Sequence, residues 1–141
     1  MKDKVFLDTN IFIYAIDTSP SYRRNQEIAR KLIATHIQNE TGVVSIQVLQ
    51  EFFVVSTGKL KVPLSSKEAL EYIQYMSILE IIQPNLDMII TAIHLHKKHL
   101  LSFWDAMVIQ TARAADCSLL LSEDLNSGFR LGSLTIQNPF Q

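Results

Sequence analysis

Four acidic residues stand at positions where an acid can do chemistry in a protein of alternating strands and helices. Asp8 ends a short apolar run, and Asp124 follows a second one. Asp105 falls in the first turn of a predicted helix, and Glu51 falls inside another. Ligands of open α/β sheets bind beyond the carboxyl ends of the strands. We therefore treat these four acids as the candidate catalytic residues.

Topology gives a reason for three of them to converge. In an alternating chain the strand-to-helix junctions all lie at one edge of the sheet, so Asp8, Asp105 and Asp124 are expected there. Glu51 joins them only if its helix leans over that edge. Its helical neighbours are mostly apolar valines, so a solvated surface charge is not the easy explanation for it. Glu123, beside Asp124, is an alternative fourth acid, and the sequence does not rank the two.

Clustered carboxylates indicate a metal ion. Two carboxylates about 4 Å apart repel by roughly 4 kcal/mol at an effective dielectric constant of about 20. Oxygen-only sites suit hard cations such as Mg²⁺ or Mn²⁺. One or two such ions activate water and neutralise charge on a phosphodiester. The expected reaction is phosphodiester hydrolysis.

Three of the four acids also have a plain structural interpretation, which stays open at this point. Ser102 and Asp105 have the spacing of a helix capping box. Asp8 fits a helix cap or a turn, and Asp124 fits an ordinary loop acid near Gly128.

The elements that would position these acids alternate along the chain. The pattern predicts an α/β fold in one domain over residues 1–141, with a central parallel sheet of four to five strands flanked by helices on both faces. The helix at 86–99 is expected to bury Ile89, Ile90 and Ile93. A capping box of Ser65 and Glu68 opens another helix. Strands are expected at 5–7, 43–45, 80–83, 118–121 and 134–136, and the other helices at 11–16 (capped by Thr9 or Asn10), 22–38, 46–57 and 102–115.

The composition excludes several classes of protein. With 141 residues, 48% of them hydrophobic, and a net charge of −1, the chain fits one core and has no overall positive field for nucleic acid. Any RNA must be held by local cations, for which Lys59, Lys61, Arg113 and Arg130 are candidates. The single Cys117 excludes an internal disulfide framework. We expect a cytoplasmic protein without a signal peptide or a membrane span.

Other catalytic patterns are weaker. His94, His96 and His99 lack an acid or cysteine that completes a transition-metal site, and a solvated helix end explains them better. Ser45 and Ser122 lack the flanking residues of a nucleophile elbow. Four glycines form no phosphate-binding loop.

Four motifs taken together resemble the PIN-domain ribonucleases. They are Asp8-Thr9-Asn10, Ser45 with Gln50-Glu51-Phe52, Phe103-Trp104-Asp105-Ala106, and Leu121-Ser122-Glu123-Asp124-Leu125. Their order and spacing match that family over nearly the whole chain, and the length is similar to that of VapC-type toxins of toxin–antitoxin pairs.

The resemblance implies a metal-dependent endoribonuclease, with Asp8, Glu51 and Asp105 as the principal acids and Asp124 as a more variable fourth. Thr9, Asn10 and Ser122 match polar positions that line the site. It also implies a homodimer, an RNA substrate and a small antitoxin whose tail enters the acidic cleft.

Two alternatives remain from the residues alone. One is a Mg²⁺-dependent phosphatase with Asp8 as nucleophile, although that chemistry usually uses a second acid where this chain has Asn10. The other is a non-catalytic receiver-like or interaction module whose acids only bind metal.

Overall fold

A single mixed sheet runs through the middle of the molecule. The computed structural model describes residues 3–141. The strands follow the order β3-β2-β1-β4-β6-β5, and every neighbouring pair is parallel except β5 with β6. The strands are β1 (Lys4–Leu7), β2 (Gly42–Ser45), β3 (Glu80–Ile82), β4 (Cys117–Leu121), β5 (Arg130–Leu131) and β6 (Leu134–Gln137).

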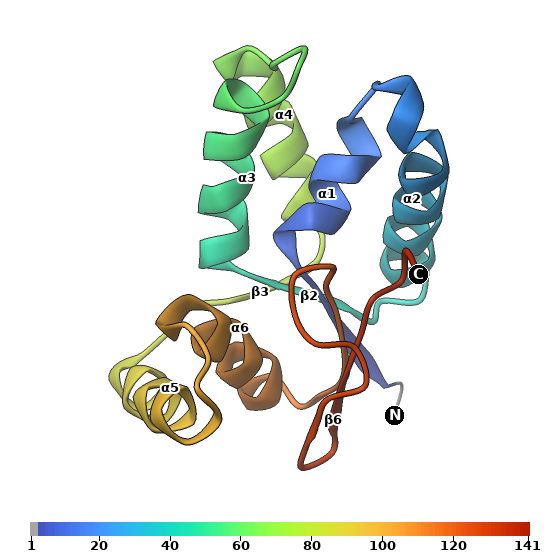
Figure 1. Cartoon of the computed structure of the whole chain (residues 1–141). Coiled ribbons are helices and arrows are strands. Elements are labelled where there is room, and N and C mark those ends of the chain that lie inside the picture. The colour runs from blue at the N-terminus through green and yellow to red at the C-terminus, as the bar shows by residue number, and fades with distance from the viewer. Residues whose placement is uncertain (1–2) are drawn as a thin grey trace.

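Helices cover both faces of the sheet, as the sequence predicts. Figure 1 shows the sheet passing between a group formed by α1 to α4 and a pair formed by α5 and α6. The helices are α1 (Thr9–Ile16), α2 (Arg23–Gln38), α3 (Ile46–Gly58), α4 (Ser66–Met76), α5 (Leu86–His99) and α6 (Phe103–Ala114), with a 3-10 turn η1 at Pro20–Tyr22.

The central strands are buried because helices lie on both sides of them. Phe6 and Leu7 of β1, Val43 of β2 and Leu120 of β4 have no exposed surface. Continuous apolar runs of this kind are typical of parallel strands covered on two faces. The predicted α/β fold is confirmed.

The sheet has one more strand than the four to five expected. β5 contains only two residues and turns back to pair with β6, through Gly132, whose φ of 62° lies in the left-handed region. A two-residue strand carries no periodicity that the sequence can display.

The prediction for α5 was wrong about its buried face. Ile89, Ile90 and Ile93 are 37%, 45% and 44% exposed, whereas Met88, Ala92 and Leu95 are buried. Both sets follow helical spacing, and α5 packs on α6 through the second. The pattern located the helix, but it could not choose between two apolar faces.

Two helix starts bear on the functional argument. The capping box of Ser65 and Glu68 is confirmed with both of its hydrogen bonds present. The cap of α1 is Asp8 and not Thr9 or Asn10, because Asp8 accepts a hydrogen bond from the Thr9 amide at 2.8 Å. Within residues 3–141, the helices are too short or too polar to cross a bilayer.

Candidate active site

The site begins where β1 and β4 end side by side. The two strands are parallel neighbours in which Leu7 pairs with Leu121, so Asp8 and Ser122 are the next residues on each. The Asp8 amide donates to the Leu121 carbonyl at 3.1 Å, which extends the pairing by one residue. Strand register therefore places Asp8 against Ser122.

Asp8 is a buried carboxylate held by two hydrogen bonds. Its side chain is only 7% exposed; the Ser122 hydroxyl donates to Oδ2 at 2.7 Å, and the Thr9 amide donates to Oδ1 at 2.8 Å. Burial raises the pKa of Asp8 to about 6, the two hydrogen bonds oppose that rise, and the charges of Glu51 and Asp124 add to it. Asp8 thus lies within the electrostatic reach of two other acids of the predicted set.

Glu51 reaches the site from α3 through Thr9. The Thr9 hydroxyl donates to Oε2 of Glu51 at 3.0 Å, and Gln47 Nε2 donates to Oε1 at 2.7 Å. The apolar neighbours of Glu51 do not keep it from solvent, contrary to the interpretation of the sequence, because Glu51 is exposed and its neighbour Val54 is 58% exposed. Gln47 is the polar helical neighbour of Glu51 in the sequence, four residues before it, but no role was predicted for it.

Asp105 does not complete a capping box. Ser102 caps α6 by accepting from the Asp105 amide at 3.1 Å. In the box of Ser65 and Glu68 the carboxylate bonds back to the serine amide, but within residues 3–141 no hydrogen bond to the Asp105 carboxylate is formed. The cap therefore uses the backbone of Asp105 and leaves its half-buried carboxylate available.

The two acids of the fourth motif point to different partners. Asp124 is exposed and accepts from Asn10 Nδ2 at 3.2 Å. The Tyr14 hydroxyl donates to Glu123, at 2.8 and 2.9 Å from its two carboxylate oxygens. Burial, and then the Glu123 carboxylate, raise the pKa of Tyr14 to about 12. Of the two acids, Asp124 is the one whose charge affects Asp8.

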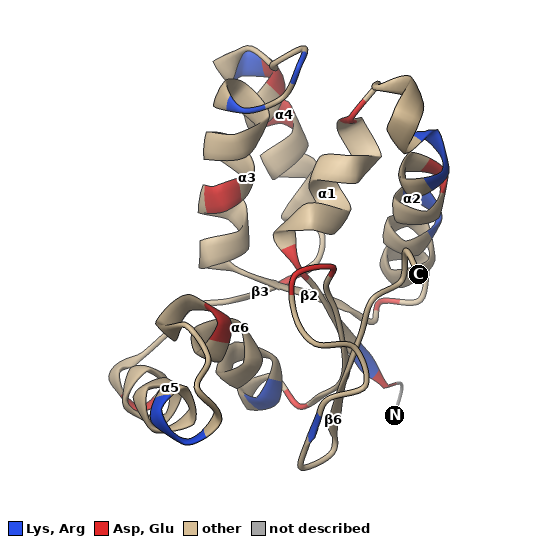
Figure 2. Cartoon of the chain, in the orientation of Figure 1, with Lys and Arg blue, Asp and Glu red and all other residues tan. Residues whose placement is uncertain are grey.

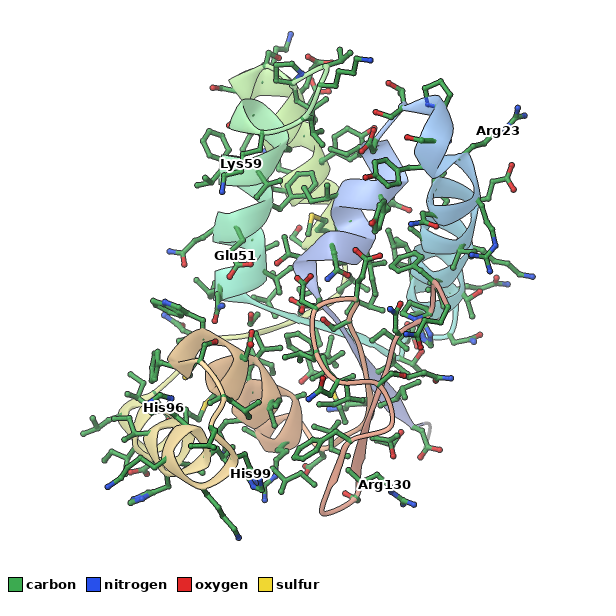
Figure 3. All side chains as sticks on the ribbon, viewed as in Figure 1. Arg23, Glu51, Lys59, His96, His99 and Arg130 are labelled. Carbon is green, nitrogen blue, oxygen red and sulfur yellow. The ribbon has the colours of Figure 1, made fainter. Side chains whose placement is uncertain are left out.

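Figure 2 shows acidic segments at the start of α1, on α3, at the start of α6 and in the loop after β4, all in the middle part of the view. The ion pairs within residues 3–141 join Lys4 to Glu80 and Arg23 to Glu27, so none of them neutralises these acids. Figure 3 shows Glu51 on α3, above the start of α6.

Three of the four candidate RNA-binding cations lie away from these acids. Lys59 lies at the far end of α3 and Arg130 on the other side of the molecule, as Figure 3 shows. Arg113 is in the last turn of α6 and lines a hollow with Asp116 and Cys117 at the opposite end of β4. Arg113 is therefore at the wrong edge of the sheet to touch a substrate held by Asp8.

The acids of the site are of the chemical type that binds a divalent cation, although they do not stand close together. Carboxylate oxygens are the ligands Mg²⁺ and Mn²⁺ prefer, and in the part of the chain that the structure describes no ion pair offsets the like charges around buried Asp8. Over residues 3–141, however, no three His, Cys, Asp or Glu side chains stand close enough to hold one ion together. Mg²⁺ is usually bound by only one or two carboxylates with several waters, so the residues present fit it.

The histidines of α5 form no such site. His96 Nδ1 hydrogen-bonds with the Leu101 carbonyl, and the His99 ring packs edge-on against Phe129 at 5.4 Å between centroids. The expected solvated helix end is only partly right, because His99 Nε2 is buried without a hydrogen-bond partner within residues 3–141.

The fold and the site together place this chain in a known family of domains. The features concerned are a buried acid at a strand end, further acids on neighbouring elements and a mostly parallel sheet. The model of the PIN domain family matches residues 5–130. The chain therefore belongs to the PIN domain family. Curated protein sequences give no match.

Solved structures share this fold at low sequence identity. A toxin–antitoxin complex from Klebsiella pneumoniae superposes with a TM-score of 0.70 at 18% identity, covering 96% of this chain and 98% of that one. VapC20 of Mycobacterium tuberculosis, a toxin that cleaves the sarcin-ricin loop, gives 0.68 at 17%, covering 86% and 92%. The DNA-bound VapBC of Salmonella typhimurium gives 0.69 at 18%, covering 98% and 99%.

Proposed function

We propose that residues 1–141 form one nuclease domain that hydrolyses RNA phosphodiester bonds internally with the help of Mg²⁺ or Mn²⁺. The observation that carries this proposal is Asp8, a carboxylate buried at a strand end with two more acids acting on it and, within residues 3–141, no ion pair to a protein cation. Membership of the PIN family favours this activity over the phosphatase and the non-catalytic module.

In this proposal Asp8, Glu51, Asp105 and Asp124 hold one or two metal ions. When bound, the ion supplies an activated water and offsets negative charge on the phosphodiester. The remaining residues hold the acids in place. Ser122 and the Thr9 amide orient Asp8, the Thr9 hydroxyl and Gln47 orient Glu51, and Asn10 orients Asp124.

A toxin role with an antitoxin partner is supported by the structural neighbours. Two of them are toxin–antitoxin assemblies, and a third is named for cleaving the sarcin-ricin loop. On this basis we assign the chain to the cytoplasm, where its RNA substrate and a small antitoxin that enters the acidic cleft would meet it. The buried thiol of Cys117 is free, which fits a reducing compartment.

The same proposal includes a homodimer. Exposed apolar side chains lie on α3 and α5, where Val54, Ile90 and Ile93 are 58%, 45% and 44% exposed. Apolar surface of this kind is typical of faces that another chain covers. Sedimentation equilibrium of the wild type and of Ile93→Lys tests it, and a wild type that stays monomeric at all concentrations contradicts it.

RNA cleavage by purified protein tests the nuclease itself. Wild type is incubated with a mixed pool of structured and unstructured RNA in Mg²⁺, in Mn²⁺ and in EDTA, beside Asp8→Asn. We expect fragments only with metal and only from wild type. An Asp8→Asn protein that cleaves as fast as wild type overturns the site assignment.

A further inference from the structure

The Tyr14 side chain links the loop after β4 to the last residues of the chain. Its hydroxyl lies 2.8 and 2.9 Å from the two carboxylate oxygens of Glu123. Its ring packs between two other aromatic rings, with centroids 4.8 Å from Phe140 and 5.3 Å from Tyr22. Tyr14 therefore contacts the residue beside Asp124 and the end of the chain at once.

The segment 138–140 is itself fixed in place over Tyr14. Arg24 donates to the Phe140 carbonyl at 2.9 Å, and the Phe140 amide donates to the Asn138 side chain at 2.9 Å. The Asn138 amide donates to the Ser127 hydroxyl at 3.1 Å. The segment thus touches α2, α1 through Tyr14, and the loop after β4.

The loop needs such support because residues 122–128 form no helix or strand. Part of its support comes from α1, where Asn10 accepts from the Glu123 amide at 3.4 Å and donates to the Asp124 carboxylate at 3.2 Å. Asn10 and Tyr14 are four residues apart, so they lie on one face of α1. From that face they hydrogen-bond to the consecutive loop residues Glu123 and Asp124.

We propose that Tyr14, with segment 138–140 packed on it, is a positioning device that sets where the loop presents Asp124, and that Glu123 is its point of attachment and not a metal ligand. The part of this that concerns metal rests on the proposed function. We call Tyr14, Arg24 and segment 138–140 the Tyr14 brace.

Two observations favour this division of roles between the neighbouring acids. Both Glu123 oxygens lie within hydrogen-bond distance of the half-buried Tyr14 hydroxyl, so this carboxylate is turned toward α1, and the acids whose charges raise the pKa of Asp8 are Glu51 and Asp124. Asp124 holds one hydrogen bond from Asn10, and its charge is felt by Asp8. Outer groups that orient a ligand commonly change metal affinity about 10- to 100-fold when they are removed.

Tyr14→Phe removes the hydroxyl and keeps the ring packed on Phe140. Tyr22→Phe is the matched control, because it removes a phenol from the same aromatic cluster and its hydroxyl has no hydrogen-bond partner within residues 3–141. Amide hydrogen exchange of the metal-free proteins is followed residue by residue. We expect faster exchange at the Glu123 and Asp124 amides in Tyr14→Phe alone, with exchange of β1 and β4 unchanged.

Mn²⁺ binding then shows whether the brace acts on the acids. Electron paramagnetic resonance of free Mn²⁺ gives the affinity without any RNA present. We expect Tyr14→Phe to bind Mn²⁺ about 10-fold more weakly, with the loss recovered at higher Mn²⁺ and Tyr22→Phe unchanged. Unchanged loop exchange and unchanged affinity in Tyr14→Phe overturn the brace.

Variants of Glu123 distinguish its role as the hydrogen-bond partner of Tyr14 from a role as a metal ligand. Glu123→Gln keeps an oxygen that can accept from Tyr14, so we expect a smaller loss of Mn²⁺ affinity than in Glu123→Ala or Asp124→Asn. A Glu123→Gln protein that loses as much as Asp124→Asn shows that Glu123 is a ligand, which contradicts the proposal. A wild type that binds no Mn²⁺ contradicts the proposed function. The amide hydrogen exchange of the loop in the metal-free proteins still tests the Tyr14 brace in that case.

Discussion

Ser122 donates its hydroxyl hydrogen to Oδ2 of Asp8 at 2.7 Å, and this bond joins the carboxyl ends of two adjacent parallel strands. The same hydroxyl oxygen accepts from the Asp124 amide at 3.2 Å. One fully buried serine therefore connects the acid of β1 with the loop that carries the fourth acid. The site is organised by the ends of β1 and β4.

Ser122→Ala should change how stability depends on pH. The Ser122 hydrogen bond lowers the pKa of Asp8 against the effect of burial, so its loss should raise that pKa further. We expect a loss of about 1–3 kcal/mol of unfolding free energy at pH 7.5, because a buried charge loses its donor. Urea unfolding between pH 4 and 8 measures this loss, and that pH range covers the rise of the Asp8 pKa from 3.8 to about 6.

Ser45→Ala is the matched control for that experiment. Ser45 is also buried and caps α3 by accepting from the Val48 amide. Its loss should cost about 1 kcal/mol at every pH, since no titrating group takes part in that cap. Equal curves for the two variants would show that Ser122 is only structural.

The metal-free protein should lose stability as the pH rises through the titration of Asp8. The folded-state pKa of about 6 lies above the ordinary value of 3.8, so the folded state holds a proton that the unfolded state has released. The favourable contribution is complete below about pH 4 and is lost as the pH passes through about 6. At 1.36 kcal/mol per pKa unit the loss is about 2–3 kcal/mol.

The difference between wild type and Asp8→Asn isolates this effect from other groups. In EDTA, the unfolding free energy of Asp8→Asn should rise relative to that of wild type from pH 4 to pH 7. Saturating Mg²⁺ should stabilise wild type more than the variant at pH 7.5. A difference that does not change with pH contradicts the raised pKa.

Gln47 should matter for cleavage more than for folding. It donates to Glu51 at 2.7 Å on the exposed side of α3, so Gln47→Ala should leave the fold intact and free the carboxylate to move. We expect about 10-fold slower cleavage, as for other residues that orient a ligand. Steady-state kinetics at several Mg²⁺ concentrations measure it, and Gln50→Ala on the same helix should cleave like wild type.

Asp105→Asn and Glu68→Ala form a pair for comparison, because both acids stand three residues after a serine cap. The Glu68 carboxylate bonds back to its cap and that of Asp105 does not. Asp105→Asn should therefore lose cleavage without losing stability, and Glu68→Ala, which removes the oxygen that accepts from the Ser65 amide, should do the reverse. Thermal unfolding and RNA cleavage of both variants decide this, and a destabilised Asp105→Asn returns that residue to a structural role.

The elements that the sequence predicted correctly are those with a local signal. Strand β1 has a continuous apolar run and α4 has its capping box, and both depend on neighbouring residues only. The choice between Ile90 and Leu95 as the buried side of α5 depends on where α6 packs, which no local pattern contains. The two-residue strand β5 exists only because β6 lies beside it.

The same distinction applies to the site. Topology alone predicts that Asp8 and Asp124 share an edge, and the structure has both there. The separate roles proposed for Asp124 and Glu123 rest on the hydrogen bond from Tyr14, which is more than a hundred positions away along the chain. Gln47 is a different case, since its spacing from Glu51 is visible in the sequence although no role was predicted for it.

The most direct test is the chemistry of the cut ends. End-labelled RNA is cleaved by wild type in Mg²⁺ and in EDTA, beside Asp8→Asn, and the new 3′ ends are analysed. Attack by water, as the account requires, predicts Mg²⁺-dependent and Asp8-dependent cuts without a 2′,3′-cyclic phosphate. Cuts that persist in EDTA or that carry the cyclic phosphate would contradict it, as would folded, inhibitor-free protein that makes no cut under any condition.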